Sequence, residues 1–408
     1  MKSNLFKSLG PGLLFAGAAI GVSHLVQSTK AGAMYGLGLF WAILLIHLFK
    51  YPFFEFGARY TAATKNTLLE GYAKLGKGYL LVYALLNLVN MFTIQAAVTI
   101  VTAGIASVLF PDLASIASIS IFISIFGGII LVIGRYKTLD QVIKYVVILL
   151  SLSTIVALIL GFIHKTPSFT TQQVFPTDLV GLTFLITFLG WMPAPLDISI
   201  WQSLWTKEKM TYSSKLEIKQ IIFDFNIGYV TTFCLGLCFM LLGGLIMYGT
   251  GMSFSSKASL FSAQFIHLYT ESIGSWAFYI IGIAAFATML STTLTTLDAS
   301  PRSFTQTVQL LIPNTSTKLY YVMLIVLICG TQALILYAGN SMGFLIKIAT
   351  ILSFLTAPFY AFMNMKLINS SHVPKAFHPK KPLFYLAVLG LIFLIGFSCY
   401  YIYFINQY

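Results

Sequence analysis

The stretch Gly10–Gly36, GPGLLFAGAAIGVSHLVQSTKAGAMYG, is apolar enough to cross a bilayer, but Gly21-Val22-Ser23-His24 interrupts it near the middle. Polar groups at that depth need partners inside the protein, because lipid offers them no hydrogen bonds. An uninterrupted spanning helix with glycine, hydroxyl and imidazole groups at its centre would be costly. We therefore interpret the stretch as a broken helix at a substrate site.

The composition places the rest of the chain in the membrane as well. Of 408 residues, 58% are hydrophobic and 9% are charged, with a mean hydropathy of +0.88, whereas soluble domains carry about 25% charged residues. A span needs about 20 apolar residues, and eleven ranges meet that rule. We predict an all-α, multi-pass integral membrane protein with helices near 10–34, 37–61, 79–109, 115–134, 140–163, 178–203, 221–249, 273–299, 318–338, 343–366 and 383–406.

The net charge of +13 could suggest a nucleic-acid partner, but the basic residues lie in short loops and form no basic domain. We therefore expect the lipid bilayer, and no nucleic acid, as the surroundings of the chain. If the N-terminus is cytoplasmic, the opposite loops hold essentially Lys30, Lys165 and Lys257. This asymmetry predicts a plasma or inner membrane protein with its N-terminus in the cytoplasm and its C-terminus outside.

A second interruption, Gly190-Trp191-Met192-Pro193-Ala194-Pro195, falls five helices after the first. Proline removes a backbone hydrogen bond, so two prolines should unwind about a turn. Interrupted segments at matching positions of two halves indicate an inverted-repeat transporter. We expect one transmembrane domain over 1–408, with one repeat over about 10–163, a second over about 178–366, and an extra helix over about 383–406.

Other motifs narrow the function class. No His-Glu-x-x-His pair, Gly-x-Ser-x-Gly elbow or phosphate loop is present, so we expect no enzyme and no cofactor. The range 273–299 carries Ser291, Thr292 and Thr293, whose hydroxyls could hold a coupling ion. The alternative is ordinary hydrogen bonding between helices.

The flanks of the first break resemble a known family. Gly10-Pro11-Gly12-Leu13-Leu14 and Ala31-Gly32-Ala33 look like the opening helix of the Nramp divalent-metal transporters, which share the LeuT-type fold. Met192-Pro193 and Ile222-Phe223-Asp224 extend the resemblance to later helices. The resemblance implies a 5+5 inverted repeat with broken helices 1 and 6, an eleventh helix, and transport of a divalent metal by alternating access.

The centre of helix 1 departs from that family. Where the family has Asp-Pro-Gly-Asn, this sequence has Gly21 in place of the metal-binding Asp and His24 in place of the Asn. The thioether ligand of helix 6 survives as Met192. We expect His24 and Met192 as the candidate metal ligands, because imidazole and thioether groups suit borderline or soft ions.

The lost carboxylate leaves a second function class open, a transporter of a small organic or anionic solute coupled to sodium or to a proton. Asp197 could replace the missing charge or pair with Lys30, and we expect His47, Lys50 and Lys347 to reach toward the membrane surface. The oligomeric state is not predicted. The candidate substrate-binding residues are Gly21, Ser23, His24, Gln27, Trp191, Met192 and Asp197, and those of a coupling-ion site are Ser291, Thr292 and Thr293.

Overall fold

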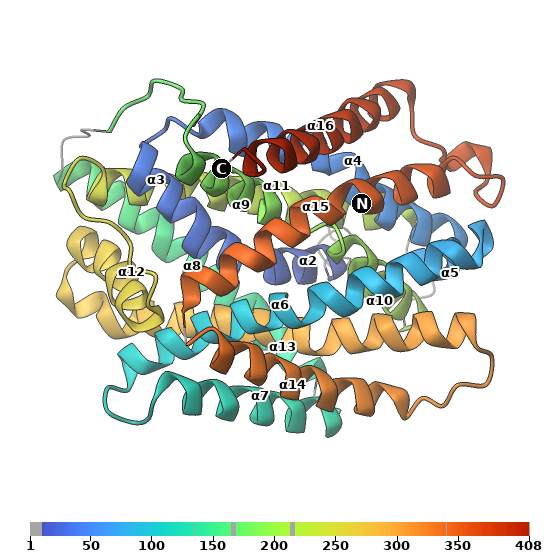
Figure 1. The fold of residues 1–408 in the computed structure, drawn as a ribbon, viewed down its shortest axis with the longest axis horizontal. Helices are drawn as coiled ribbons and strands as arrows, with labels where there is room; N and C mark the ends of the chain where they lie inside the picture. The colour runs from blue at the N-terminus through green and yellow to red at the C-terminus, as the bar shows by residue number, and fades with distance from the viewer. Residues whose placement is uncertain (1–9, 135, 165–168, 213–216, 340, 408) are drawn as a thin grey trace.

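The computed structural model describes residues 10–134, 136–164, 169–212, 217–339 and 341–407. Within these ranges the chain is helical and holds no strand beyond an isolated bridge between Lys257 and Ser341. Most of the long helices run roughly along the long axis of the molecule as one bundle (Figure 1). All eleven ranges predicted from the sequence contain helix.

The first half of the chain forms the first broken helix and four further long helices. The elements are α2 (Pro11–Ala19), η1 (Ser23–Ser28), α3 (Thr29–Tyr35), α4 (Phe40–Thr64), α5 (Leu68–Leu75), α6 (Lys77–Leu109), α7 (Ile116–Val132) and α8 (Tyr136–His164). The segment η1 begins at Ser23, within the predicted break, and has π-helical hydrogen bonding, which widens the helical turn there.

The second half repeats this plan and adds a final helix. Its elements are α9 (Leu179–Trp191), α10 (Ile198–Tyr212), α11 (Ile218–Met247), α12 (Ala258–Ile273), η2 (Ser275–Ala277), α13 (Phe278–Leu311), α14 (Leu319–Tyr337), α15 (Met342–Ile368), η3 (Lys375–Phe377) and α16 (Lys381–Ile405). The residues between α9 and α10, Met192–Asp197, are not helical, which confirms the second predicted break.

Length and composition alone identify six described helices that could cross a membrane, and a seventh if α2 and Ser23–Tyr35 form one span with a 47° bend. Ile116–Val132, Ile148–His164 and Leu179–Trp191 are shorter apolar helices. The chain is therefore an integral, multi-pass membrane protein. The count of eleven spans and the boundaries of the two repeats remain predictions.

The first broken helix packs on α11 through glycines. A Cβ atom on Gly12 would lie 2.0 Å from the carbonyl oxygen of Asp224, and one on Gly32 would lie 1.8 Å from that of Met240. Only a residue without a side chain allows two backbones to approach so closely. Both halves of the broken helix are thereby fixed against one continuous helix.

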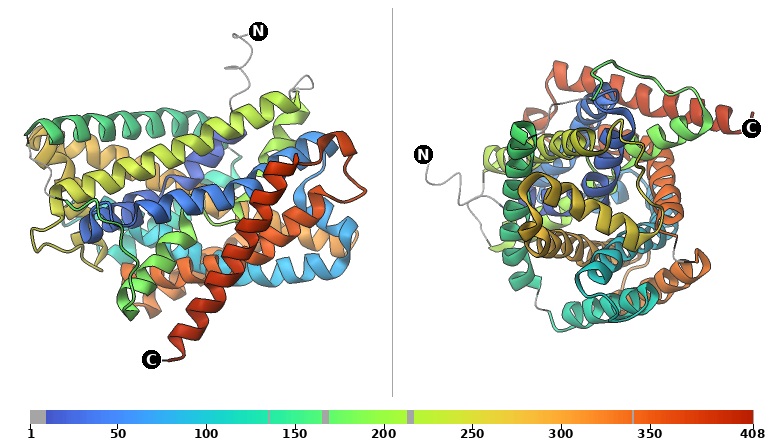
Figure 2. Two further views of the ribbon diagram at one scale, coloured as in Figure 1. Left: turned by 90° about the horizontal axis from the view of Figure 1, so that it is seen from above. Right: turned by 90° about the vertical axis from the view of Figure 1, so that its left-hand side faces the viewer.

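The helices that cover the bundle differ from those inside it. Viewed along the bundle, α7, α14 and α16 lie at its periphery and the first broken helix lies inside (Figure 2). Only 28% of the most apolar window of α14 and 22% of that of α16 are buried within the protein. The short helices α5 and α12 cover opposite ends of the bundle (Figure 1).

Candidate functional site

The two breaks meet at the centre of the bundle and enclose a small cavity. Its volume is about 20 Å³, which holds one water-sized particle, since a water molecule needs roughly 10–15 Å³ on the same scale. The polar side chains on its wall are those of Ser23, Thr292 and Thr296 and the indoles of Trp191 and Trp201. Helices α2, η1, α6, α9, α10 and α13 contribute to the lining.

Gly21 lies directly against α13. A Cβ atom at this position would be 2.9 Å from Thr292 Oγ1 and 3.0 Å from Thr292 Cγ2. The Thr292 hydroxyl is 3.3 Å from the carbonyl oxygen of Gly17 and 3.2 Å from that of Thr288. The glycine that replaces the family's aspartate therefore gives the threonine of α13 access to the broken helix.

His24 is fully buried and held at both ring nitrogens. Nε2 is 2.9 Å from the carbonyl oxygen of Thr232, and Nδ1 is 3.0 Å from that of Ala19 and 2.7 Å from Ser23 Oγ. Ser23 Oγ also donates to the Ala19 carbonyl, at 2.6 Å. A metal ion that binds His24 must displace one of these partners.

Met192 begins the second break and is also fully buried. The hydroxyl of Ser28 donates to Met192 Sδ at 3.7 Å, across the two broken helices. Neither Met192 nor His24 lines the cavity of about 20 Å³, although each lies next to residues that do. The two predicted metal ligands are thus brought to the same region but face protein partners.

Lys50, in the middle of α4, enters the second break. Its side chain is fully buried, and its ammonium group donates to the carbonyl oxygens of Leu189, Gly190, Met192 and Ala194 at 2.9, 2.8, 3.0 and 3.2 Å. The prediction that Lys50 reaches the membrane surface is wrong. The surface prediction for His47 is also wrong, because its side chain is 4% exposed and its Nδ1 lies 2.7 Å from the Ile43 carbonyl.

Asp197 ends the second break and precedes α10, where helix amides favour a carboxylate. It is 2% exposed, and its Oδ1 atom has no hydrogen-bond partner. No ion pair between Asp197 and Lys30 is found among the described residues, and Lys30 instead lines a cavity to which Asp197 does not contribute.

The three hydroxyls predicted to form a coupling-ion site face different neighbours, as successive helix positions must. Thr292 faces the broken helix, and Thr293 Oγ1 lies 2.8 Å from Thr102 Oγ1 of α6. Ser291 Oγ is buried without a hydrogen-bond partner. Of the three, only Thr292 lines the cavity of about 20 Å³, where Thr296, one turn later, joins it.

A larger cavity, of about 450 Å³, lies toward the end of the bundle where α9 and α15 begin. Gln27 and Lys30 of the first broken helix and Lys347 of α15 line it, together with Thr183, Thr187 and Ser256. No carboxylate belongs to the lining found among the described residues. The predicted substrate residues Gln27 and Trp191 therefore belong to separate cavities.

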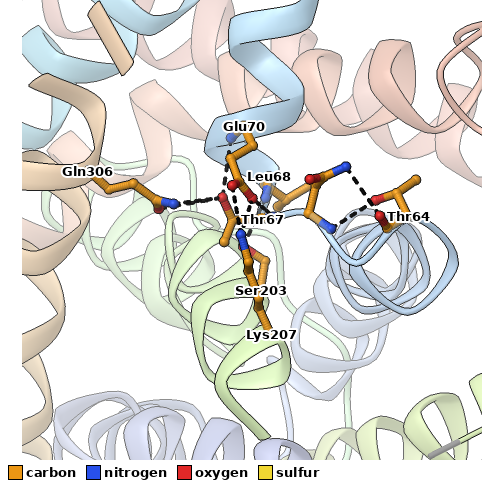
Figure 3. Close-up of polar contacts among 8 residues, drawn as sticks. Thr64, Thr67, Leu68, Glu70, Ser203, Lys207 and Gln306 are labelled. Carbon is orange, nitrogen blue, oxygen red and sulfur yellow. Dashed lines mark hydrogen bonds and ion pairs between the residues drawn. The ribbon is translucent and has the colours of Figure 1, made fainter. Parts of the chain in front are cut away.

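The opposite end of the bundle is closed by polar contacts among α5, α10 and α13 (Figure 3). Lys207 Nζ lies 2.7 and 2.8 Å from the two carboxylate oxygens of Glu70, and Ser203 Oγ accepts from the Leu68 amide at 3.0 Å. Thr67 Oγ1 accepts from the Gln306 side-chain amide at 3.2 Å. These contacts tie α10, the second half of the second broken helix, to α5 and α13 beside it.

Asp224 of α11 secures the start of the first broken helix at the same end. Its two carboxylate oxygens accept from the amides of Gly10 and Gly12 at 3.0 and 2.8 Å. An acid at a helix N-terminus satisfies unpaired amides and complements the helix dipole. This contact explains the acidic residue in Ile222-Phe223-Asp224.

No group of three or more His, Cys, Asp or Glu side chains that could hold a metal occurs among the residues that the structure describes. The polar groups found at the meeting point of the breaks are hydroxyl, imidazole and thioether groups. Sequence reasoning missed the role of Lys50, although an ionisable residue within a span was its signal.

The paired breaks, the central cavity and the bundle of apolar helices define a membrane transporter of the broken-helix class. The family model described as natural resistance-associated macrophage protein-like, Nramp, matches residues 12–404. The chain belongs to the Nramp family, as its first helix and Met192-Pro193 predicted.

Relatives and solved structures agree with this assignment. An uncharacterized protein of Pasteurella multocida (strain Pm70) is 34% identical, and the match covers 97% of this chain and 92% of that protein. The crystal structure of a point mutant of the Eremococcus coleocola manganese transporter matches with a TM-score of 0.73 at 14% identity, over 97% of this chain and 86% of that one.

Two further solved structures share the fold outside the family. Mhp1, a nucleobase-cation-symport-1 family transporter, matches with a TM-score of 0.62 at 13% identity, over 98% of this chain and 92% of that one. MhsT in complex with L-phenylalanine matches with a TM-score of 0.62 at 16% identity, over 95% of this chain and 98% of that one. The predicted LeuT-type fold with broken helices 1 and 6 is confirmed.

Proposed function

We propose that the chain is a secondary active transporter that moves a divalent metal cation by alternating access. The observation that carries the proposal is a cavity of about 20 Å³ at the meeting point of the two breaks. A cavity of this size fits a single ion. The fold shared with a manganese transporter supports the same substrate class. No enzymatic activity and no cofactor belong to the proposal.

The proposed ion-binding groups are the hydroxyls of Ser23, Thr292 and Thr296, with His24 and Met192 as neighbours that bind after they release their present partners. Hydroxyl and carbonyl oxygens suit hard cations, whereas imidazole and thioether groups suit softer ones. Asp197 is the nearest candidate to balance the charge of the ion. This mixed set favours a borderline divalent ion over calcium.

The two ends of the bundle support an alternating-access cycle. Contacts among α5, α10 and α13 close one end, while the cavity of about 450 Å³ lies at the other. In the proposed cycle α10 separates from α5 and opens the closed end. The distribution of basic residues in the loops supports a topology in which the N-terminal end lies in the cytoplasm. In this proposed topology the larger cavity faces outside, and the proposed coupling ion is a proton or sodium.

The alternative substrate, a small organic or anionic solute, has one observation in its favour. Lys30 and Lys347 give the larger cavity a positive lining. The central cavity, at about 20 Å³, is far smaller than any such solute. The size of the central cavity therefore favours a metal ion, and the same transport assay distinguishes the two substrates.

The test is uptake of manganese, iron, cobalt, zinc and magnesium into proteoliposomes that contain the purified protein. We expect saturable uptake of at least one of these ions, and reduced uptake by Thr292→Val, which removes a hydroxyl from the cavity wall. Thr250→Val, which removes an exposed loop hydroxyl, serves as the control. No uptake of any metal, together with uptake of an amino acid or organic acid, would refute the proposal.

A further inference from the structure

Lys50 occupies a site that is built from backbone oxygen atoms. Its side chain has no exposed surface, and its Nζ atom lies within 2.8–3.2 Å of four carbonyl oxygens. All four belong to the end of α9 and the break that follows it, whereas Lys50 itself lies on α4. The lysine therefore joins two helices that are distant in the sequence.

The break explains why these oxygens are available. In a continuous helix the Leu189 carbonyl would accept from the amide of residue 193, but this residue is a proline and has no N–H group. The end of a helix leaves further carbonyl oxygens without partners and carries a partial negative charge. Buried oxygens in this state need a donor, and Lys50 is the one that reaches them.

The geometry resembles that of a cation site. An ammonium group has three N–H donors and no acceptor, so four surrounding carbonyl oxygens solvate it as they would solvate a dehydrated monovalent ion. No carboxylate contacts the Nζ atom among the described residues, where its hydrogen-bond partners are the four carbonyl oxygens. The carbonyl oxygens are thus the direct partners of the charge.

We propose that Lys50 is a tethered cation. Its ammonium group occupies a monovalent-cation site within the second break, between α9 and α10, and fixes the shape of that break. The proposal concerns a positioning residue and is independent of which substrate the transporter carries. It implies that the carbonyl oxygens keep their affinity for a small cation when the lysine side chain is removed. Ammonium, methylammonium and potassium match the charge and size of the lost group.

The site of Lys50 adjoins the central cavity of about 20 Å³. Trp191 and Pro195 line that cavity, and the carbonyls of Met192 and Ala194 between them accept from Lys50. The ammonium group of Lys50 therefore lies behind the backbone of the second break, next to the place where the breaks meet. No free monovalent cation is required to hold the helix 6 break in this chain.

The experiment measures the thermal unfolding temperature of purified Lys50→Ala in detergent, at constant ionic strength. Ammonium, methylammonium or potassium chloride is titrated against N-methylglucamine chloride, whose cation is too large for the site. We expect a lower Tm for the variant than for the wild type, and saturable recovery of about half of the loss by a small cation. Wild type and Lys318→Ala, which removes an exposed lysine, should show no such dependence.

Two results would overturn the proposal. The first is a folded Lys50→Ala whose Tm equals that of the wild type or does not respond to any small cation. If Lys50→Ala cannot be purified in ordinary buffers, it is expressed and purified again with methylammonium in all buffers. The second overturning result is that no folded protein is recovered under these conditions either. Because the readout is stability, a failure of metal transport does not affect the result.

Discussion

Both broken helices leave backbone carbonyl oxygens without partners in the helix, and different kinds of donor satisfy these oxygens in the two breaks. In the first, neutral groups serve the interrupted backbone, as Ser23 donates to the Ala19 carbonyl and Thr292 to the Gly17 carbonyl. In the second, the ammonium group of Lys50 serves four carbonyls at once. The first break contains no carboxylate or ammonium side chain, whereas the second holds the buried ammonium group of Lys50.

The difference shows how a divergent Nramp protein can lose its helix 1 carboxylate and keep its fold. The glycine flanks and Asp224 fix the first broken helix to α11, so its centre is free to change. The two ionisable side chains at the second break are Asp197, which ends it, and Lys50 of α4, which enters it.

Replacement of Lys50 by methionine should have the largest effect. The side chain keeps much of its volume, but four buried carbonyl oxygens lose their donor, at about 1–3 kcal/mol for a buried unsatisfied group. We expect a loss of at least about 3 kcal/mol in unfolding free energy, measured by denaturant or thermal unfolding. A Lys50→Met protein as stable as Lys318→Met would show that the second break does not depend on a buried ammonium group.

Gly21→Asp tests whether the first break can regain its charge. The Cβ atom would lie 2.9 Å from Thr292 Oγ1, so the single variant should lose about 1–3 kcal/mol through overpacking. Gly21→Asp combined with Thr292→Ala should recover stability, because the second change removes the obstructing atoms. Calorimetry should then show tighter binding of divalent ions than in Thr292→Ala alone, and equal affinity would contradict a charge-based account.

Lys207→Met should have the smallest effect on stability. Lys207 and Glu70 form a partly exposed pair whose side chains are 36% and 24% exposed, and such pairs contribute about 0.2–1 kcal/mol. The pair lies outside both breaks, so metal affinity should stay unchanged while the closed end opens more often. Labelling of a cysteine introduced at Gln306, a neighbour of Thr67, should accelerate in Lys207→Met, and unchanged labelling would remove this pair from the closing contacts.

Much of the architecture was predictable because it depends on local sequence. Pro193 and Pro195 require a break within Met192–Asp197, and glycine with polar residues in an apolar run indicated the first one. The flanking glycines of helix 1 carried the family resemblance because their close backbone contacts leave no alternative residue. These features involve a few neighbouring residues each.

The partners of individual side chains were not predictable in the same way. The hydropathy of lysine predicts that the Lys50 side chain reaches water, but the rotation of α4 about its own axis directs the side chain into the second break. The same limit applies to Gln27 and Trp191, which the sequence assigned to one site and which line two cavities. Only the packing of helices distant in sequence decides such contacts.

Calorimetric titration of the purified protein with manganese, iron, cobalt and zinc tests the central claim that one metal ion binds where the breaks meet. We predict a saturable one-site signal for at least one ion. Thr292→Val should weaken the affinity about tenfold, or about 1.4 kcal/mol, and His24→Ala and Met192→Ala should weaken it as well. Thr250→Val should leave the affinity unchanged. No signal with any metal, or the same affinity in all four variants, would contradict the account.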